Sequence, residues 1–249
     1  MSSAVLELQG VHTHIGAYHI LHGVDLAVPA GQVTMLLGRN GAGKSTTLRT
    51  VMGLWPTSQG AVHIKGRQIG GPGGQLTTPD IAQLGIAYVP EAMGIFTDLT
   101  VQENMVLAAR RARRAAELDT TRLEWIFGLF PALKKFWLYP AGKLSGGQKQ
   151  MLAVARAIIE PRALILIDEP SKGLAPSIIN NLIDAFRQLK SQSTTILLVE
   201  HKMDVVSELA DRIIVLHNGA LVADGEPAAV IASPVVQQAY LGIVPEEAA

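Results

Sequence analysis

The residues of this chain best suited to chemistry form a glycine-rich loop that ends in Lys44 and Ser45. Positions 38–45 match the pattern G-x-x-x-x-G-K-[ST], with an apolar run before them and a helical pattern after them. The glycines allow backbone N–H groups to cradle phosphate oxygens, and the helix N-terminus adds positive potential. Lys44 is expected to reach the β- and γ-phosphates of a nucleotide, and the Ser45 hydroxyl to ligate Mg²⁺. We call residues 38–45 the phosphate loop and expect nucleotide contacts from Gly38, Arg39, Asn40, Gly41, Ala42, Gly43, Lys44, Ser45 and Thr46.

Two carboxylates stand at the end of a second apolar run, where Asp168 and Glu169 follow residues 164–167. At the carboxyl end of a parallel strand, Asp168 is expected to hold Mg²⁺ near the phosphate loop. Glu169 is expected to orient or deprotonate the water that attacks the γ-phosphate. The alternatives are a solvated Asp-Glu pair here and a chance glycine-rich turn at the phosphate loop. The glycine-rich turn is disfavoured because the strand, the loop, the lysine and the serine are all in place, and the solvated pair is disfavoured because a phosphate loop is present in the same chain.

Composition narrows the class of protein. The chain has 249 residues, no cysteine, a formal net charge of zero and 48% hydrophobic residues. No apolar stretch approaches the roughly 18 residues that a membrane span needs, and no signal peptide is evident. The absence of cysteine suits a reducing cytosol, and the zero net charge argues against nucleic acid as a partner. The high apolarity fits a large partner surface and a well-buried parallel sheet equally well.

Apolar runs alternate with helical patterns, which predicts right-handed crossovers and a largely parallel sheet. The first and last strand pairs are expected to be antiparallel. Strand patterns vanish from about Thr100 to Pro140, which predicts an all-helical insert. We expect one domain over 1–249, with a core of about 1–95 and 150–249 and a helical subdomain of about 96–149. The expected strands are 5–11, 33–37, 61–64, 86–89, 163–167, 195–199, 213–216 and 220–223.

A further motif, at positions 144–148, reads Leu-Ser-Gly-Gly-Gln and precedes a helical pattern. The Ser145 side chain is suited to cap that helix. The same hydroxyl and the bare N–H groups of the first helical turn are also suited to bind an anion. Both interpretations remain open from the residues alone.

At this point the sequence resembles the ATP-binding cassette (ABC) family, through the phosphate loop, the motif at 144–148, the Asp168-Glu169 strand end and His201. The resemblance covers nearly the whole chain. It implies an α/β P-loop NTPase fold with a RecA-like, mainly parallel core sheet, an antiparallel β subdomain and an inserted α-helical subdomain. It also implies two cassettes head to tail, each closing its motif on the ATP of the other, with His201 at the γ-phosphate. The motif residues that would contact that ATP are Ser145, Gly146, Gly147 and Gln148.

Several positions depart from the family pattern. Glu91 stands where the family usually has a glutamine that reaches Mg²⁺ and the attacking water, and a carboxylate can also ligate the ion. The family often stacks adenine on an aromatic residue at a position that matches Ile15 here, and Tyr18 is the nearest aromatic residue. The segment 171–176 lacks the aspartate that many members have. Lys172 in that segment is either solvated or paired across the seam between cassettes.

The motifs around Glu91 and Gly173, with the ending at 239–242, resemble ATPase subunits of branched-chain (hydrophobic) amino-acid importers. A urea or amide importer subunit, a lipid or peptide exporter and a non-transport clamp are the alternatives. The resemblance implies a second cassette (a copy or a paralogue), two separate membrane permeases and, indirectly, a periplasmic or extracellular solute-binding protein. It also implies a peripheral position on the cytoplasmic side of the inner or plasma membrane.

Two surface features complete the expectations. The aromatic residues between Trp125 and Tyr139 are expected to be partly core, and residues 136–139 are open to either plain packing or contact with a membrane-subunit helix. The arginines between positions 110 and 114 are expected on a solvated helix face with Glu117 as a partner. Attraction of these arginines to anionic lipid headgroups is the alternative.

Overall fold

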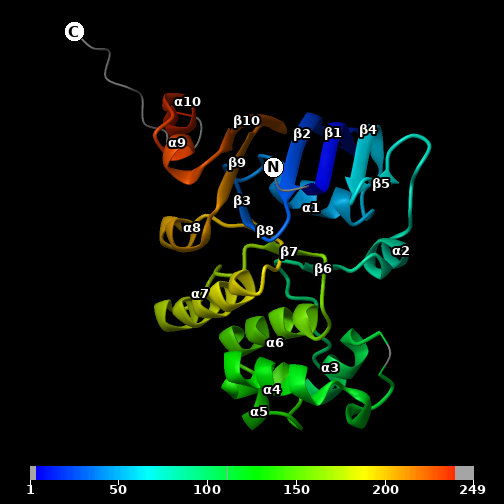
Figure 1. The fold of residues 1–249 in the computed structure, drawn as a ribbon, viewed down its shortest axis with the longest axis vertical. Helices are drawn as coiled ribbons and strands as arrows, with labels where there is room; N and C mark the ends of the chain where they lie inside the picture. Colours follow the sequence, from blue (N-terminus) through cyan, green and yellow to red (C-terminus); the bar gives the residue numbers. More distant parts are fainter. Residues whose placement is uncertain (1–3, 111, 239–249) are drawn as a thin grey trace.

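The computed structural model describes residues 4–110 and 112–238. Position 111 and the ending at 239–242, which entered the sequence expectations, lie outside these ranges. In the described residues, two β-sheets and a helical region build the fold (Figure 1). Within the described ranges, none of the helices combines the length and the apolarity needed to cross a bilayer.

The core sheet has six strands in the order β10-β9-β3-β8-β7-β6. The five strands from β9 to β6 are parallel, and β10 is antiparallel to β9. All residues of β3, β7 and β8 are buried, which explains their continuous apolar runs. The expected strands over 33–37 and 86–89 are present with these bounds. The six strands are β3 (Val33–Leu37), β6 (Ile86–Val89), β7 (Leu164–Asp168), β8 (Ile196–Val199), β9 (Arg212–His217) and β10 (Ala220–Gly225).

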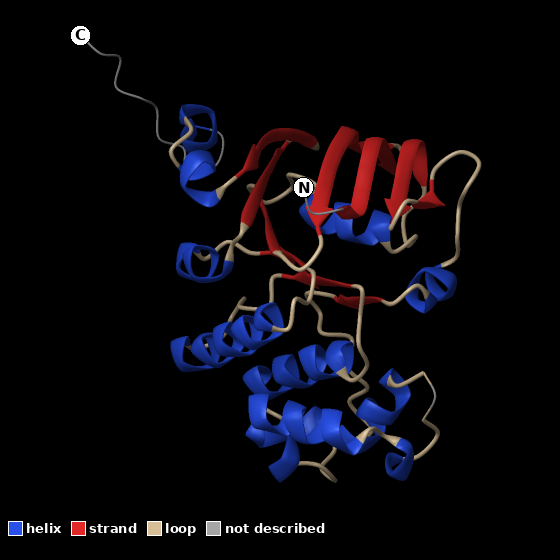
Figure 2. Ribbon diagram, in the orientation of Figure 1, coloured by secondary structure: helices blue, strands red, loops and turns tan. Residues whose placement is uncertain are grey.

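The second sheet is antiparallel and has the order β2-β1-β4-β5 (Figure 2). Register shifts interrupt the pairing of β1 with both of its neighbours. The expected strands did not include β2 and β5. In β2 the spacing of the buried residues shifts between Leu21 and Val24, although residues 24–28 alternate regularly, and β5 has only four residues. The first hairpin, β1 with β2, is antiparallel as expected. The four strands are β1 (Ala4–Ile15), β2 (Tyr18–Pro29), β4 (Thr57–Ile64) and β5 (Arg67–Gly70).

Helices connect the parallel strands and form a separate group between β6 and α6 (Figure 1). The α-helices are α1 (Lys44–Val51), α2 (Thr78–Gln83), α3 (Val101–Ala108), α4 (Thr120–Leu129), α5 (Pro131–Lys135), α6 (Gly146–Ile158), α7 (Pro176–Ser191), α8 (Met203–Leu209), α9 (Pro227–Ile231) and α10 (Pro234–Val236). The 3₁₀ helices of the described ranges are η1 (Ala115–Glu117) and η2 (Ala141–Lys143).

The prediction that a helix carries the arginines between positions 110 and 114 is wrong. A capping box between Thr100 and Glu103 starts α3, but the helix ends at Ala108. Ala109 then adopts an extended conformation. Glu117 does act as a partner: one carboxylate oxygen accepts from the Arg114 side chain at 2.7 Å, and the other accepts from the backbone N–H of Arg113.

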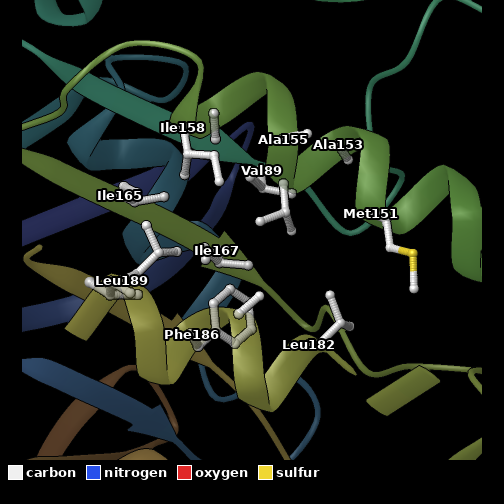
Figure 3. Packing of buried hydrophobic residues seen from close by; sticks show 14 of the residues in the cluster. Val89, Met151, Ala153, Ala155, Ile158, Ile165, Ile167, Leu182, Phe186 and Leu189 are labelled. Atoms are coloured by element: carbon white, nitrogen blue, oxygen red, sulfur yellow. The ribbon is translucent and has the colours of Figure 1, made fainter. Parts of the chain in front are cut away.

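Alternate residues of the core sheet face two different apolar clusters. Ile165 and Ile167 of β7 pack against α6 and α7, whereas Leu164 and Leu166 face the cluster that contains α1 and the antiparallel sheet. Figure 3 shows Phe186 of α7 beneath the strand residues. The sheet is therefore covered on both faces, which accounts for much of the chain's apolar composition.

Replacement of Phe186 by alanine tests this packing. Phe186 is 1% exposed, so Phe186→Ala should leave a cavity and lower the free energy of unfolding by about 3–5 kcal/mol. Urea denaturation followed by circular dichroism measures the loss. Leu107→Ala is the control, because Leu107 is 59% exposed and its replacement should change stability by no more than about 0.5 kcal/mol. Equal effects of the two substitutions would contradict the proposed core.

Candidate active site

The phosphate loop lies between the end of β3 and the start of α1, as the sequence predicts. A Cβ atom added to Gly38 would lie 2.3 Å from the Leu216 carbonyl oxygen, so only glycine allows this approach to β9. Gly43, the N-cap of α1, has a φ of 101°, which favours glycine. The backbone N–H of Gly219 also donates to the Ala42 carbonyl at 3.1 Å, which ties the loop to the β9–β10 turn.

Lys44 is held inside this loop and is 5% exposed. Its ammonium group donates to the carbonyl oxygens of Gly38 at 2.9 Å and Arg39 at 3.0 Å. Burial lowers the pKa of Lys44, and the charges of Glu169 and Asp168 oppose that shift. A phosphate placed over the loop would supply the buried ammonium group with a charged acceptor in place of neutral carbonyls.

Asp168, at the end of β7, is fully buried and faces Ser45. The Ser45 hydroxyl donates to one Asp168 oxygen at 3.0 Å. The other oxygen, Oδ2, has no hydrogen-bond partner among the described residues. Burial raises the pKa of Asp168, since only the hydrogen bond from Ser45 and the charge of Arg49 oppose it. A buried carboxylate oxygen without a partner, next to a hydroxyl, fits a hard divalent cation such as Mg²⁺.

Glu169 follows Asp168 in a left-handed conformation with a φ of 48°, which is strained for a residue with a side chain. Its backbone N–H donates to the Val199 carbonyl at 3.0 Å. One carboxylate oxygen lies 2.8 Å from His201 Nε2. Burial raises the pKa of Glu169, but the hydrogen bond and charge of His201, together with those of Lys172, outweigh burial and lower it. The carboxylate is therefore ionised at neutral pH and able to accept a proton.

Lys172 pairs within its own chain. Its ammonium group lies 2.5 Å from a Glu91 oxygen and 3.3 Å from a Glu169 oxygen. The hydrogen bonds to Glu91 and then to Glu169 raise the pKa of Lys172. The Lys172 side chain is also 61% exposed, so it is partly solvated, and a partner across a seam between cassettes stays a prediction.

A cavity of about 370 Å³ lies over the phosphate loop, and we call it the phosphate cavity. It brings together residues from distant parts of the sequence. Asp168 adjoins it through Ser45, and His201 through Glu169. The residues that line it are Ile20, Asn40, Gly41, Gly43, Lys44, Ser45, Thr46, Glu91, Glu169 and Lys172.

Tyr18 is not among the lining residues and is 76% exposed. Ile20, two residues further along β2, does line the cavity. Ile20 was not identified from the sequence. Alternate residues of a strand share a face, so the choice of Tyr18 already implied that Ile20 lies on the same face of the strand. The side chain nearest to the loop from this hairpin is therefore aliphatic.

The motif at 144–148 also lies outside the phosphate cavity of its own chain. Ser145 caps α6: its hydroxyl accepts from the Gln148 N–H at 3.3 Å, and the Gln148 side chain accepts from the Ser145 N–H at 3.0 Å. Ser145 and Gly146 are exposed. The capping interpretation describes the isolated chain, while the exposed helix N-terminus is still open to a ligand.

A second cavity, of about 650 Å³, lies between the core and the helical insert, and we call it the insert groove. It combines an apolar lining with four arginines. Pro90, Met93 and Gly94 line it, while Glu91 from the same segment lines the phosphate cavity. The arginines are Arg49, Arg110, Arg156 and Arg162.

A phosphate loop between a buried strand and a helix, beside an Asp-Glu strand end, defines a P-loop nucleotide-binding domain. A family model described as ABC transporter matches residues 21–172. The chain therefore belongs to the ABC transporter family of ATP-binding subunits, which couple ATP hydrolysis to transport.

Individual relatives match along almost their whole length. The high-affinity branched-chain amino acid transport ATP-binding protein BraG of Pseudomonas aeruginosa is 37% identical, over 96% of this chain and 100% of that protein. A probable branched-chain amino acid transport ATP-binding protein, LivF of Archaeoglobus fulgidus, is 33% identical over 91% of this chain and 94% of that protein.

Solved structures show the same fold. A nucleotide-free ATP-binding cassette from an ABC transporter superposes with a TM-score of 0.80 and 25% identity, over 97% of this chain and 100% of the other. The ADP conformation of an ATP-binding cassette of an ABC transporter gives a TM-score of 0.78 and 26% identity, with the same coverage. The α/β P-loop NTPase fold expected from the sequence is thereby confirmed.

Asp168→Asn tests the buried carboxylate. Because burial raises the pKa of Asp168, ionisation destabilises the fold at neutral pH, and this cost disappears as the pH falls through the raised pKa. The asparagine variant should therefore gain about 0.5–2 kcal/mol of stability at neutral pH and gain less in acid. It should also lose any tightening of nucleotide binding by Mg²⁺. Asp184→Asn, at a 66% exposed side chain, is the control, and an unchanged Mg²⁺ effect in Asp168→Asn would contradict the assignment.

Proposed function

We propose that this chain is the ATP-hydrolysing subunit of an importer for branched-chain or other hydrophobic amino acids. The observation that carries the proposal is the convergence of the phosphate loop, Asp168 and the Glu169–His201 pair on one cavity. The names of BraG and LivF, which match along nearly the full chain, support the class of solute. The division into a core of about 1–95 and 150–249 and a helical subdomain of about 96–149 belongs to the same proposal.

The phosphates of ATP would lie on the loop, with Lys44 at the β- and γ-phosphates. Ser45, Asp168 and Glu91 would hold the Mg²⁺, which when bound neutralises phosphate charge. The unpartnered Oδ2 of Asp168 and its contact with Ser45 support these two donors. Glu91 lines the phosphate cavity and would turn one oxygen to the ion while Lys172 holds the other. Thr46 and the backbone N–H groups of the loop would complete the contacts with the phosphate oxygens.

Glu169 would take the proton from the attacking water. Its ionised carboxylate, at the border of the phosphate cavity, suits that role. His201, 2.8 Å from Glu169, would hold the carboxylate in place and contact the γ-phosphate. The strained backbone of Glu169 is consistent with a side chain that is fixed for one position.

A second cassette would complete each site. The exposed N-terminus of α6 lies away from its own phosphate cavity, so Ser145, Gly146, Gly147 and Gln148 would meet the ATP of a partner cassette. ATP would then join the two chains, and hydrolysis would separate them. The partner is a paralogue or a second copy. The adenine would rest near Ile20 and Tyr18 of the first hairpin.

The insert groove suits a helix of a membrane permease. Its apolar lining would accept an amphipathic helix. Arg110 and Arg162 already pair with Glu160. An acidic side chain of that helix would therefore meet Arg49 or Arg156. The segment 90–94 borders both cavities, so an occupant of the groove would reach the ATP site through Glu91. Two such permeases would hold the chain at the cytoplasmic side of the membrane, and a solute-binding protein would act on the far side.

In the aromatic segment 136–139, the first two side chains are packed and the last two are exposed. Phe136 and Trp137 pack against the core cluster, and Trp137 meets Phe127 edge to face at 5.2 Å. Leu138 and Tyr139 are 70% and 52% exposed. Contact with a membrane subunit would therefore fall to Leu138 and Tyr139, whereas replacement of Trp137 would disturb the insert itself.

Glu169→Gln tests the catalytic assignment. Because glutamine cannot take the proton of the attacking water, turnover should fall by about 10²–10⁴-fold while ATP still binds. Release of inorganic phosphate measures turnover, and size-exclusion chromatography should show an ATP-bound dimer that accumulates. Glu124→Gln, at a 63% exposed side chain in the insert, is the matched control. Normal turnover in Glu169→Gln would overturn the role of Glu169.

Leu54→Asp tests the permease contact. Leu54 lines the insert groove and is 49% exposed, so a carboxylate there should weaken docking of an apolar helix. Affinity purification from gently solubilised membranes, with mass spectrometry, should recover two multi-span proteins and a second cassette with the unmodified chain. Recovery should drop for Leu54→Asp and persist for Leu221→Asp, whose position on β10 is exposed and outside the groove. Soluble partners alone would contradict the transport assignment.

A further inference from the structure

One ammonium group contacts carboxylates from two distant segments. Lys172 reaches Glu91, at the end of the groove segment, and Glu169, the proposed proton acceptor. The three residues all line the phosphate cavity. The side chain of Glu169 is only 13% exposed, whereas those of Glu91 and Lys172 are 42% and 61% exposed.

The charge balance of the cavity makes this contact consequential. Glu91, Glu169 and Asp168 place three carboxylates around a space that would receive the phosphates of ATP. Negative charges that lie close together repel one another, and the repulsion is stronger where water is excluded. Glu91 brings a negative charge that a glutamine at the same position would lack, and Lys172 offsets that charge. The carboxylate at 91 and the cation at 172 therefore form a matched pair.

The contact also connects the two cavities. Glu91 belongs to the segment 90–94, of which Pro90, Met93 and Gly94 line the insert groove, and Met93 there has a φ of 63°. The Arg156 side chain donates to the Gly94 carbonyl, which ties this segment to α6. Glu169 is tied in turn to His201 and to β8. A shift of the groove segment would thus move Glu91, and Lys172 would carry that shift to Glu169.

We propose that Lys172 is a positioning residue of the ATPase site, which neutralises Glu91 and links the groove segment to the catalytic carboxylate. The inference rests on the proposed ATPase function and adds a residue to it. Lys172 has no assigned catalytic contact of its own. It acts through its contacts with Glu91 and Glu169. Its effect should therefore depend on which residue stands at position 91.

A double-mutant cycle of Lys172→Met and Glu91→Gln tests this dependence. Affinity for a fluorescent ATP analogue is measured in EDTA, and turnover is measured with Mg²⁺. Lys172→Met should weaken binding and slow turnover by roughly three- to tenfold, because it leaves Glu91 unneutralised beside the phosphates. Adding Glu91→Gln should restore the binding affinity, and Lys172→Arg should retain both binding and turnover.

Lys134→Met is the matched control, because Lys134 pairs with Glu124 at a similar exposure in the helical insert. It should change neither quantity. Unchanged binding and turnover in Lys172→Met, or effects that simply add in the double variant, would overturn the role of Lys172. If the unmodified chain neither binds nor hydrolyses ATP, the proposed function itself is overturned. Failure of the proposed role of Lys172 and failure of the proposed function are therefore distinguishable.

Discussion

Binding of a phosphate chain inside a protein requires fixed positive groups that need no rearrangement, and the core of this fold meets that requirement. The phosphate loop turns between a buried strand and a helix N-terminus, where backbone N–H groups and Lys44 converge. The neighbouring parallel strands end at the same edge, so Asp168 and Glu169 arrive beside the loop from a distant part of the sequence. The buried sheet beneath them, covered on both faces, fixes these positions.

Much of this arrangement could be predicted from the sequence, because it depends on local patterns. The apolar run of β3 and the glycines after it define their own strand and loop. The antiparallel sheet was harder to predict. The regular alternation in β2 covers only residues 24–28, and the four residues of β5 are too few to show a pattern, so both strands were missing from the expected ones. The helix expected over the arginines ended early, because Ala109 leaves the helical conformation.

Contacts across the fold could not be predicted in the same way. Lys172 and Glu91 are far apart in the sequence, and only the alignment of β6 with β7 brings their strand ends together. The unusual residues at both positions were visible, but their pairing was not. Ile20 was missed for a related reason, since the crossing of β2 over the phosphate loop is a tertiary feature. Family resemblance supplied what a single chain does not display, namely a second cassette for the exposed end of α6.

Release of inorganic phosphate from ATP by the purified chain tests the central claim most directly. We expect release with Mg²⁺ that rises more than linearly with protein concentration, because two chains or a chain and its paralogue must close on the nucleotide, and we expect no release in EDTA. Bound ATP that is never hydrolysed, under conditions where dimers form, would contradict a catalytic site built from Asp168, Glu169 and His201. Release that is unaffected by EDTA would contradict the metal site at Ser45 and Asp168.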